Sequence, residues 1–151
     1  MNLINLLKHK VNEASKYSKD KSNNHGEVFT PEHLIKEMLY SLPKETWSNP
    51  NLTFLDPCAG KGNFTVIIIQ GLMNGLKDIF PNKLERYRHI IENQIYICEY
   101  QRESAETINR IFNIGNRFTL NLYIGDTLKM PSDFFDLNIN ERKMKYPENC
   151  L

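Results

Sequence analysis

The fold is decided by one stretch of sequence, Thr53-Phe54-Leu55-Asp56-Pro57-Cys58-Ala59-Gly60-Lys61-Gly62-Asn63-Phe64. An apolar run ends at an acid and a proline, two glycines flank a lysine, and a second apolar segment follows. This order predicts a buried strand, a tight glycine turn and the start of a helix. Glycine permits a positive φ and leaves backbone amides open to a ligand, and a helix begins with unpaired N–H groups. The stretch therefore predicts half of a small-molecule pocket.

Length and composition describe a protein of one domain. With 151 residues, 40% of them hydrophobic and 25% charged, the chain suits a soluble globular protein. A formal net charge of +1 gives no field strong enough to imply nucleic-acid binding by itself. No apolar run reaches the length of a membrane span and no signal peptide opens the chain, so we expect a cytoplasmic protein without membrane contact.

The cysteines argue against a disulfide framework and against a zinc site. Cys58, Cys98 and Cys150 are too few and too widely spaced for either. Because Cys58 and Cys98 lie in or beside predicted strands, we expect both to be buried free thiols.

Apolar periodicity predicts an alternation of helices and strands along the chain. Helical spacing recurs in several segments, and short apolar runs between them end in polar residues. Thr30 followed by Pro31 predicts a helix start, with the threonine as the capping residue. Strands that alternate with helices at this spacing predict an α/β protein with a parallel sheet and right-handed crossovers. The predicted helices cover residues 2–17, 32–42, 64–76 and 101–112, and the predicted strands residues 53–56, 94–99 and 118–124.

Each predicted strand ends at an acid, namely Asp56, Glu99 and Asp126. The carboxyl ends of the strands of an open parallel sheet line its ligand crevice. Three acids brought together there repel one another unless a ligand donates hydrogen bonds to them. A nucleoside that also carries an amine suits them, with the amine at Asp56, the ribose hydroxyls at Glu99 and the adenine amino group at Asp126. The alternative is that strand ends are polar simply because they reach water.

Two other phosphate-binding motifs fit the glycine turn less well. A Walker A loop needs four residues between its glycines and then Gly-Lys-Ser/Thr, which Gly60-Lys61-Gly62-Asn63 does not provide. A dinucleotide fingerprint needs a third glycine or alanine where Thr65 stands. NAD is therefore the second choice of ligand, and ATP through a Walker A loop is disfavoured.

Two segments resemble the motifs of a known enzyme family. Asp56 to Phe64 resembles the Asp-Pro-x-x-Gly-x-Gly-x-Phe signature of S-adenosylmethionine-dependent DNA adenine (N6) amino-methyltransferases. Gly26-Glu27-Val28-Phe29-Thr30-Pro31 resembles the Gly-Glu-x-Phe-Thr-Pro segment that precedes it there, an order typical of Type I modification subunits and related restriction–modification enzymes. The resemblance covers residues 20–130 or so. It implies a Rossmann-like class I methyltransferase fold with helices on both faces of a parallel sheet.

The resemblance also implies roles for individual residues. Asp56 and the two glycines would surround the methionine part of S-adenosylmethionine, and Phe29 with its two successors would close over it. Glu99 would bind the ribose hydroxyls and Asp126 the adenine amino group. The full set of cofactor-binding residues implied is Phe29, Thr30, Pro31, Asp56, Pro57, Gly60, Gly62, Phe64, Glu99, Tyr100, Asp126 and Thr127.

The sequence departs from the family in one respect. The catalytic motif Asn/Asp-Pro-Pro-Tyr/Phe, which belongs at the end of a fourth strand, does not occur in the 151 residues, although residues 133–146 resemble the approach to that strand. No catalytic residue is therefore assigned, and we expect the chain to be inactive alone. Residues 1–24 are interpreted as an N-terminal helix and polar loop, and residues 25–151 as a partial methyltransferase domain with an incomplete sheet.

Three hypotheses follow for such a chain. It is a truncated methyltransferase or one piece of a split enzyme whose second polypeptide carries the catalytic motif, with DNA bound through a missing or separate region. Alternatively, it is a non-catalytic protein that binds S-adenosylmethionine. The third hypothesis is a decayed, poorly folding fragment, since a sheet cut after three strands leaves an edge strand with unpaired backbone N–H and C=O groups.

Overall fold

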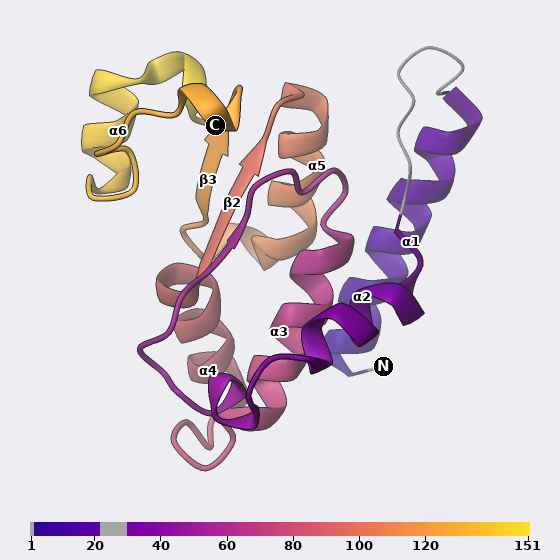
Figure 1. Ribbon diagram of the computed structural model, residues 1–151. Helices are drawn as coiled ribbons and strands as arrows, with labels where there is room; N and C mark the ends of the chain where they lie inside the picture. The colour runs from indigo at the N-terminus through magenta and orange to yellow at the C-terminus, as the bar shows by residue number, and fades with distance from the viewer. Residues whose placement is uncertain (1, 22–29) are drawn as a thin grey trace.

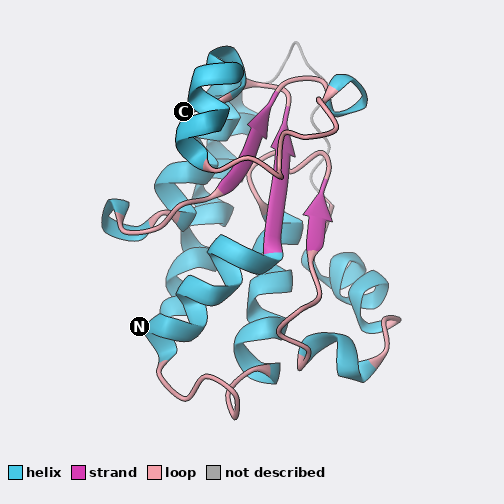
Figure 2. Cartoon of the chain, turned by 90° about the vertical axis from the view of Figure 1, so that its left-hand side faces the viewer, coloured by secondary structure: helices cyan, strands magenta, loops and turns pink. Residues whose placement is uncertain are grey.

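The computed structural model describes residues 2–21 and 30–151, with side chains described for residues 2–16 and 30–151. Within them a three-stranded parallel sheet has the order β1-β2-β3, and all three strands point the same way in Figure 2. The strands are β1 (Phe54–Asp56), β2 (Ile95–Glu99) and β3 (Asn121–Ile124). The helices are α1 (Leu3–Lys21), α2 (Glu32–Tyr40), α3 (Asn63–Gly75), α4 (Lys83–His89), α5 (Arg102–Phe112) and α6 (Ile139–Lys145). The predicted α/β fold with an incomplete parallel sheet is confirmed.

Helices gather on one side of the sheet and the C-terminal segment lies on the other (Figure 1). On the first side α5 contacts β2 and β3, α1 contacts α3 and α5, and α2 contacts α3. On the other side Phe134 packs with Cys98, Tyr123 and Cys150. Both faces are therefore covered over β2 and β3, as a parallel sheet requires.

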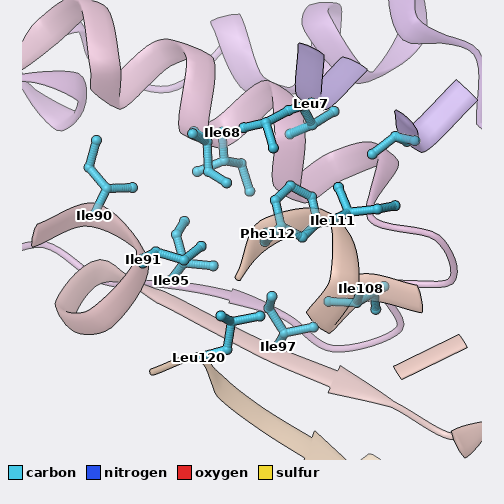
Figure 3. Packing of buried hydrophobic residues seen from close by; sticks show 14 of the residues in the cluster. Leu7, Ile68, Ile90, Ile91, Ile95, Ile97, Ile108, Ile111, Phe112 and Leu120 are labelled. Atoms are coloured by element: carbon cyan, nitrogen blue, oxygen red, sulfur yellow. The ribbon is translucent and has the colours of Figure 1, made fainter. Parts of the chain in front are cut away.

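The main core fills the space between the helices and the first face of the sheet. Figure 3 shows Leu7 of α1, Ile68 of α3 and Phe112 of α5 on the helical side, with Ile97 and Leu120 on the side of the sheet. Their exposed fractions lie between 0% and 7%. Burying side chains of this size contributes about 1.5–3 kcal/mol each, so α1 is an integral part of the domain.

A buried arginine holds the C-terminal segment against the sheet. Arg142 of α6 donates from Nε to the carbonyl oxygen of Phe134 at 2.9 Å, and its two terminal nitrogens lie 3.2 and 3.3 Å from Oδ1 of Asn121 in β3. Its guanidinium also lies over the Phe134 ring. Asn138 and Glu141 form a capping box at the start of α6. Residues 133–146, expected to approach a fourth strand, thus form turns and a helix.

Three local predictions were wrong. Helix α2 begins at Glu32 with Pro31 as its N-cap residue, and no side chain caps it, so Thr30 is not the cap. The third strand begins at Asn121 and not at residue 118. Cys98 is buried as predicted, but Cys58 is exposed because the loop after β1 turns it outward.

Two glycines inside α3 are explained by Trp47. A Cβ on Gly71 would lie 2.5 Å from Cε3 of Trp47, and a Cβ on Gly75 would lie 2.1 Å from its carbonyl oxygen. The indole in turn stacks on Phe54 of β1, with ring centroids 5.7 Å apart. The glycines therefore let the segment before β1 lie close against α3. Helix propensity alone would treat both glycines only as destabilising residues.

We predict that Gly75→Ala destabilises the protein by about 1–3 kcal/mol in urea unfolding, because the new methyl group meets a backbone oxygen that cannot rotate away. Helix propensity alone predicts a gain of about 1 kcal/mol. Asn74→Ala is the matched control, since Asn74 is exposed on the same helix. Equal effects of the two substitutions on the free energy of unfolding would contradict this account of Gly75.

Candidate functional site

The glycine turn between β1 and α3 has left-handed backbone conformations at both glycines. Gly60 has φ 56° and Gly62 has φ 89°. A Cβ on Gly62 would lie 2.6 Å from Cε2 of Phe112, whereas nothing lies within 4 Å of the position of a Cβ on Gly60. Position 62 therefore requires glycine for two reasons, its positive φ and the close approach of the Phe112 ring. Gly60 borders open space, which leaves room for a ligand beside its backbone.

Glu99, at the end of β2, holds this turn in place. Its Oε2 accepts a hydrogen bond from the backbone N–H of Gly60 at 2.7 Å, and its Oε1 accepts one from the N–H of Gln101 at 2.9 Å. The residue is only 7% exposed. Glu99 therefore fixes the glycine turn and the loop after β2 to one buried carboxyl group.

Asp56, at the end of β1, is turned into the protein. Its Oδ2 accepts a hydrogen bond from the hydroxyl of Thr65 at 2.7 Å, and the backbone N–H groups of Cys58 and Thr65 also donate to its carboxyl. Burial is the largest influence on this group and raises its pKa, and the hydrogen bonds oppose that rise. The observed role of Asp56 is to join β1 to the first turn of α3.

The loop after β3 is tied to both neighbouring loops. The N–H of Gly125 donates to the carbonyl oxygen of Glu99 at 2.9 Å, and the Thr127 hydroxyl donates to that of Pro57 at 2.6 Å. Asp126 caps the short turn that follows by accepting from the N–H of Leu128 at 3.1 Å. Its side chain is 39% exposed, so it presents a carboxylate to solvent beside the other two strand ends.

The remaining predicted site residues lie in three places. Tyr100 directly follows Glu99 and is 75% exposed. Phe64 is partly buried and packs against the main core. Thr30 and Pro31 line a cavity between α1, α2 and α3, and Phe29 lies outside the described residues. The structure therefore brings six of the predicted residues together at the carboxyl ends of the three strands, namely Asp56, Pro57, Gly60, Glu99, Asp126 and Thr127.

Some residues of the site could not be found from the sequence pattern. Thr65 looks like one more β-branched residue in an apolar run, yet it is the partner of Asp56. Lys61 is only 7% exposed, and its ammonium donates to the hydroxyl of Ser104 in α5 at 2.7 Å. The Lys61–Ser104 pair joins segments 43 residues apart, and the Asp56–Thr65 pair spans the glycine turn, so the periodicity of apolar residues predicts neither pair.

The electrostatics of the strand ends differ from the expectation in one respect. The acids were expected to need a ligand to offset their mutual repulsion. Backbone and hydroxyl donors already satisfy Asp56 and Glu99, and Lys129 lies 3.7 Å from Asp126. The acids are therefore compatible with the free protein, and they shape the turn before any ligand binds.

Comparison with known proteins assigns the chain to a family. The family model described as N-6 DNA Methylase matches residues 14–145. The chain belongs to the N-6 DNA methylase family. The match includes every predicted site residue and also the second half of α1, which packs against α3.

Two curated proteins are similar to this N-6 DNA methylase family member. An "Uncharacterized adenine-specific methylase" of Mycoplasma pneumoniae is 31% identical over 127 residues, which is 82% of this chain and 25% of the relative. An "Undecaprenyl-diphosphatase" of Wigglesworthia glossinidia brevipalpis is 31% identical over 80 residues, which is 53% of this chain and 29% of that protein. The chain thus spans between a quarter and a third of the length of these relatives. Within the described parts of this chain, no helix is long and apolar enough to cross a membrane.

The raised pKa of Asp56 predicts a pH dependence of stability. An acid whose pKa is higher in the folded than in the unfolded protein stabilises the fold below the unfolded value, and this contribution is lost as the pH rises through the folded value. We therefore expect the unfolding free energy of wild type to fall relative to that of Asp56→Asn between about pH 4 and about pH 7.

The measurement is urea unfolding of both proteins across that range, taken as a difference. Glu32 and Asp133, whose pKa values are lowered by lysine partners, titrate in both proteins and cancel from it. A difference that stays flat, or that changes in favour of wild type as the pH rises, would show that burial of Asp56 is not the dominant effect.

Proposed function

We propose that this chain forms the S-adenosylmethionine-binding part of a DNA adenine-N6 methyltransferase. Membership of the N-6 DNA methylase family supports the class of reaction. The observation that carries the proposal lies at the carboxyl end of the sheet. There hydrogen bonds link the loops after β1, β2 and β3 around the turn at Gly60. This end is where ligands bind in open α/β sheets.

The groups at this end of the sheet fit an adenosine. The open space at Gly60 lets a ligand approach the backbone, and Glu99 places a carboxylate, the acceptor type that suits ribose hydroxyls, beside that space. Asp126 offers an exposed carboxylate to an exocyclic amino group, and Tyr100 offers an exposed ring on which a base can stack. We assign Thr127 and Pro57 to the frame, because their mutual hydrogen bond fixes the spacing of the β1 and β3 loops.

The methionine end of the cofactor is assigned to the other side of the glycine turn. Asp56 and Gly62 fix the turn there, and Thr30 and Pro31 line the neighbouring cavity. The contacts of Phe29 and Phe64 with the cofactor stay predictions from the motif. When bound, S-adenosylmethionine supplies a methyl group on a sulfonium, and the chain's own residues bind and orient it.

Methyl transfer to adenine requires a second set of groups. The target amine must be extruded from the DNA helix and polarised by acceptors, and the motif that provides them in the family does not occur in these 151 residues. We propose that a region outside these 151 residues, in a longer form of this chain or in a second polypeptide, supplies this motif and the DNA contacts of a restriction–modification enzyme acting in the cytoplasm.

The sheet offers a place for such a polypeptide. Among the described residues β1 pairs only with β2, which leaves its other edge free of strand partners. Leu55 in the middle of β1 is 52% exposed, although strands of parallel sheets are usually covered on both faces. A further strand on this edge would stand beside Asp56 and so beside the cofactor.

We predict that the chain binds S-adenosylhomocysteine with a micromolar dissociation constant in calorimetry. Asp126→Ala should weaken binding about tenfold or more, as expected for the loss of one charge-assisted hydrogen bond. Asp136→Ala is the control, because Asp136 is an exposed acid of the C-terminal segment. Absence of binding by wild type would refute the proposed cofactor, and equal weakening by both variants would refute the role of Asp126.

We predict that the chain alone transfers no labelled methyl group from S-adenosylmethionine to DNA. Adding a polypeptide that carries Asn-Pro-Pro-Tyr/Phe should restore transfer, because it supplies the acceptors for the target amine. Substituting the asparagine of that motif by alanine is the control. Cofactor binding without transfer in either mixture would instead support the alternative of a non-catalytic S-adenosylmethionine-binding protein.

A further inference from the structure

We propose that α1 supplies a subsite for the α-carboxylate of the cofactor's methionine part, with Lys16 and Ser15 as its ligands. The inference rests on the proposed function. The motifs at Thr30 and Asp56 do not include α1, and packing alone accounts only for its apolar face. Its polar face, with Lys16 and Asn12, borders a cavity of about 340 Å³ between α1, α2 and α3.

Among the described residues that line this cavity, Lys16 is the cation left for a ligand. Lys8 lies 2.7 Å from the Glu32 carboxylate, and Lys36 lies 2.8 Å from the same oxygen. Glu32 is therefore neutralised by two partners, and Lys8 is engaged. Lys16 lines the same cavity and has no ion pair or hydrogen bond within the described part of the chain. An anion entering the cavity meets Lys16 as the available positive charge.

A buried hydroxyl lines the same cavity as this lysine. Ser15 is 8% exposed, and its Oγ accepts a hydrogen bond from Nδ2 of Asn63 at 3.3 Å. The hydroxyl proton of Ser15 has no acceptor among residues 2–16 and 30–151. A buried hydroxyl is expected to find an acceptor, because a buried donor without a hydrogen bond is energetically costly. A carboxylate oxygen in the cavity would accept from Ser15 and from the Lys16 ammonium together.

The position of the cavity selects the methionine end of the cofactor. Asn63 directly follows Gly62 of the turn, and Thr30 and Pro31 form the opposite wall. The ribose and adenine positions lie at Glu99 and beyond, at the edge of the sheet, so the amino-acid end is the part left for this side. A backbone phosphate of duplex DNA fits less well, because Ser15 is almost completely buried.

Two ligands separate this subsite from the rest of the site. S-adenosylhomocysteine carries the amino-acid carboxylate, and 5′-methylthioadenosine has the same nucleoside without it. For Lys16→Met we expect the dissociation constant of S-adenosylhomocysteine to rise about three- to tenfold, as for one partly exposed ion pair with a hydrogen bond. The dissociation constant of 5′-methylthioadenosine should not change. Lys16→Arg should retain most of the affinity, because it keeps the charge.

The controls make each result decisive. Lys10→Met removes a charge from the same helix outside the cavity, and we expect no change for either ligand. If wild type binds both ligands but Lys16→Met weakens them equally or not at all, the subsite is wrong and the proposed function stands. The subsite is also wrong if Lys10→Met has the same effect as Lys16→Met, since the charge would then act from a distance. If wild type binds neither ligand, the proposed function itself is wrong.

Discussion

The candidate site depends on one carboxylate, that of Glu99. Its two oxygens accept the N–H groups of Gly60 and Gln101, so the glycine turn after β1 and the loop after β2 are fixed to the same buried group. Hydrogen bonds to a charged acceptor are worth about 1.5–3 kcal/mol each, which is enough to order a turn that would otherwise be free. The loop after β3 then closes on this pair through Gly125 and Thr127. The ligand edge is therefore preorganised before anything binds.

Packing on both faces of the sheet fixes the position of these strand ends and their loops. On one face Phe112 fills the space left by Gly62, and this contact places α5 directly under the turn. Trp47 wedges against Gly71 and Gly75 and so fixes the segment that enters β1. On the other face Arg142 anchors the C-terminal segment to Asn121. The outer edges of β1 and β3 have no strand neighbour among the described residues.

The sequence predicts the strands, the helices after them and the three acids at the strand ends, because each depends on local periodicity and on turn chemistry. It does not predict what the acids do, because their hydrogen bonds to hydroxyl and backbone N–H groups depend on the geometry of the turns and not on apolar periodicity. Asp56 was expected to meet a ligand amine, yet it accepts the hydroxyl of Thr65. Thr30 was expected to cap α2, yet Pro31 stands at that position and Thr30 lines a cavity with α1. The packing of α1 on α3, which creates that cavity, is a tertiary fact without a local signature.

The central claim is that the linked strand ends form the cofactor site. The most direct measurement is a backbone nitrogen-15 NMR titration of the full chain with S-adenosylhomocysteine. The account predicts shift changes at the amides of Gly60, Gln101 and Leu128, with little change at Trp47 or in α6. Changes centred on Trp47 and the part of α3 that packs against it, or no change at Gly60 and Gln101 at saturating ligand, would contradict it.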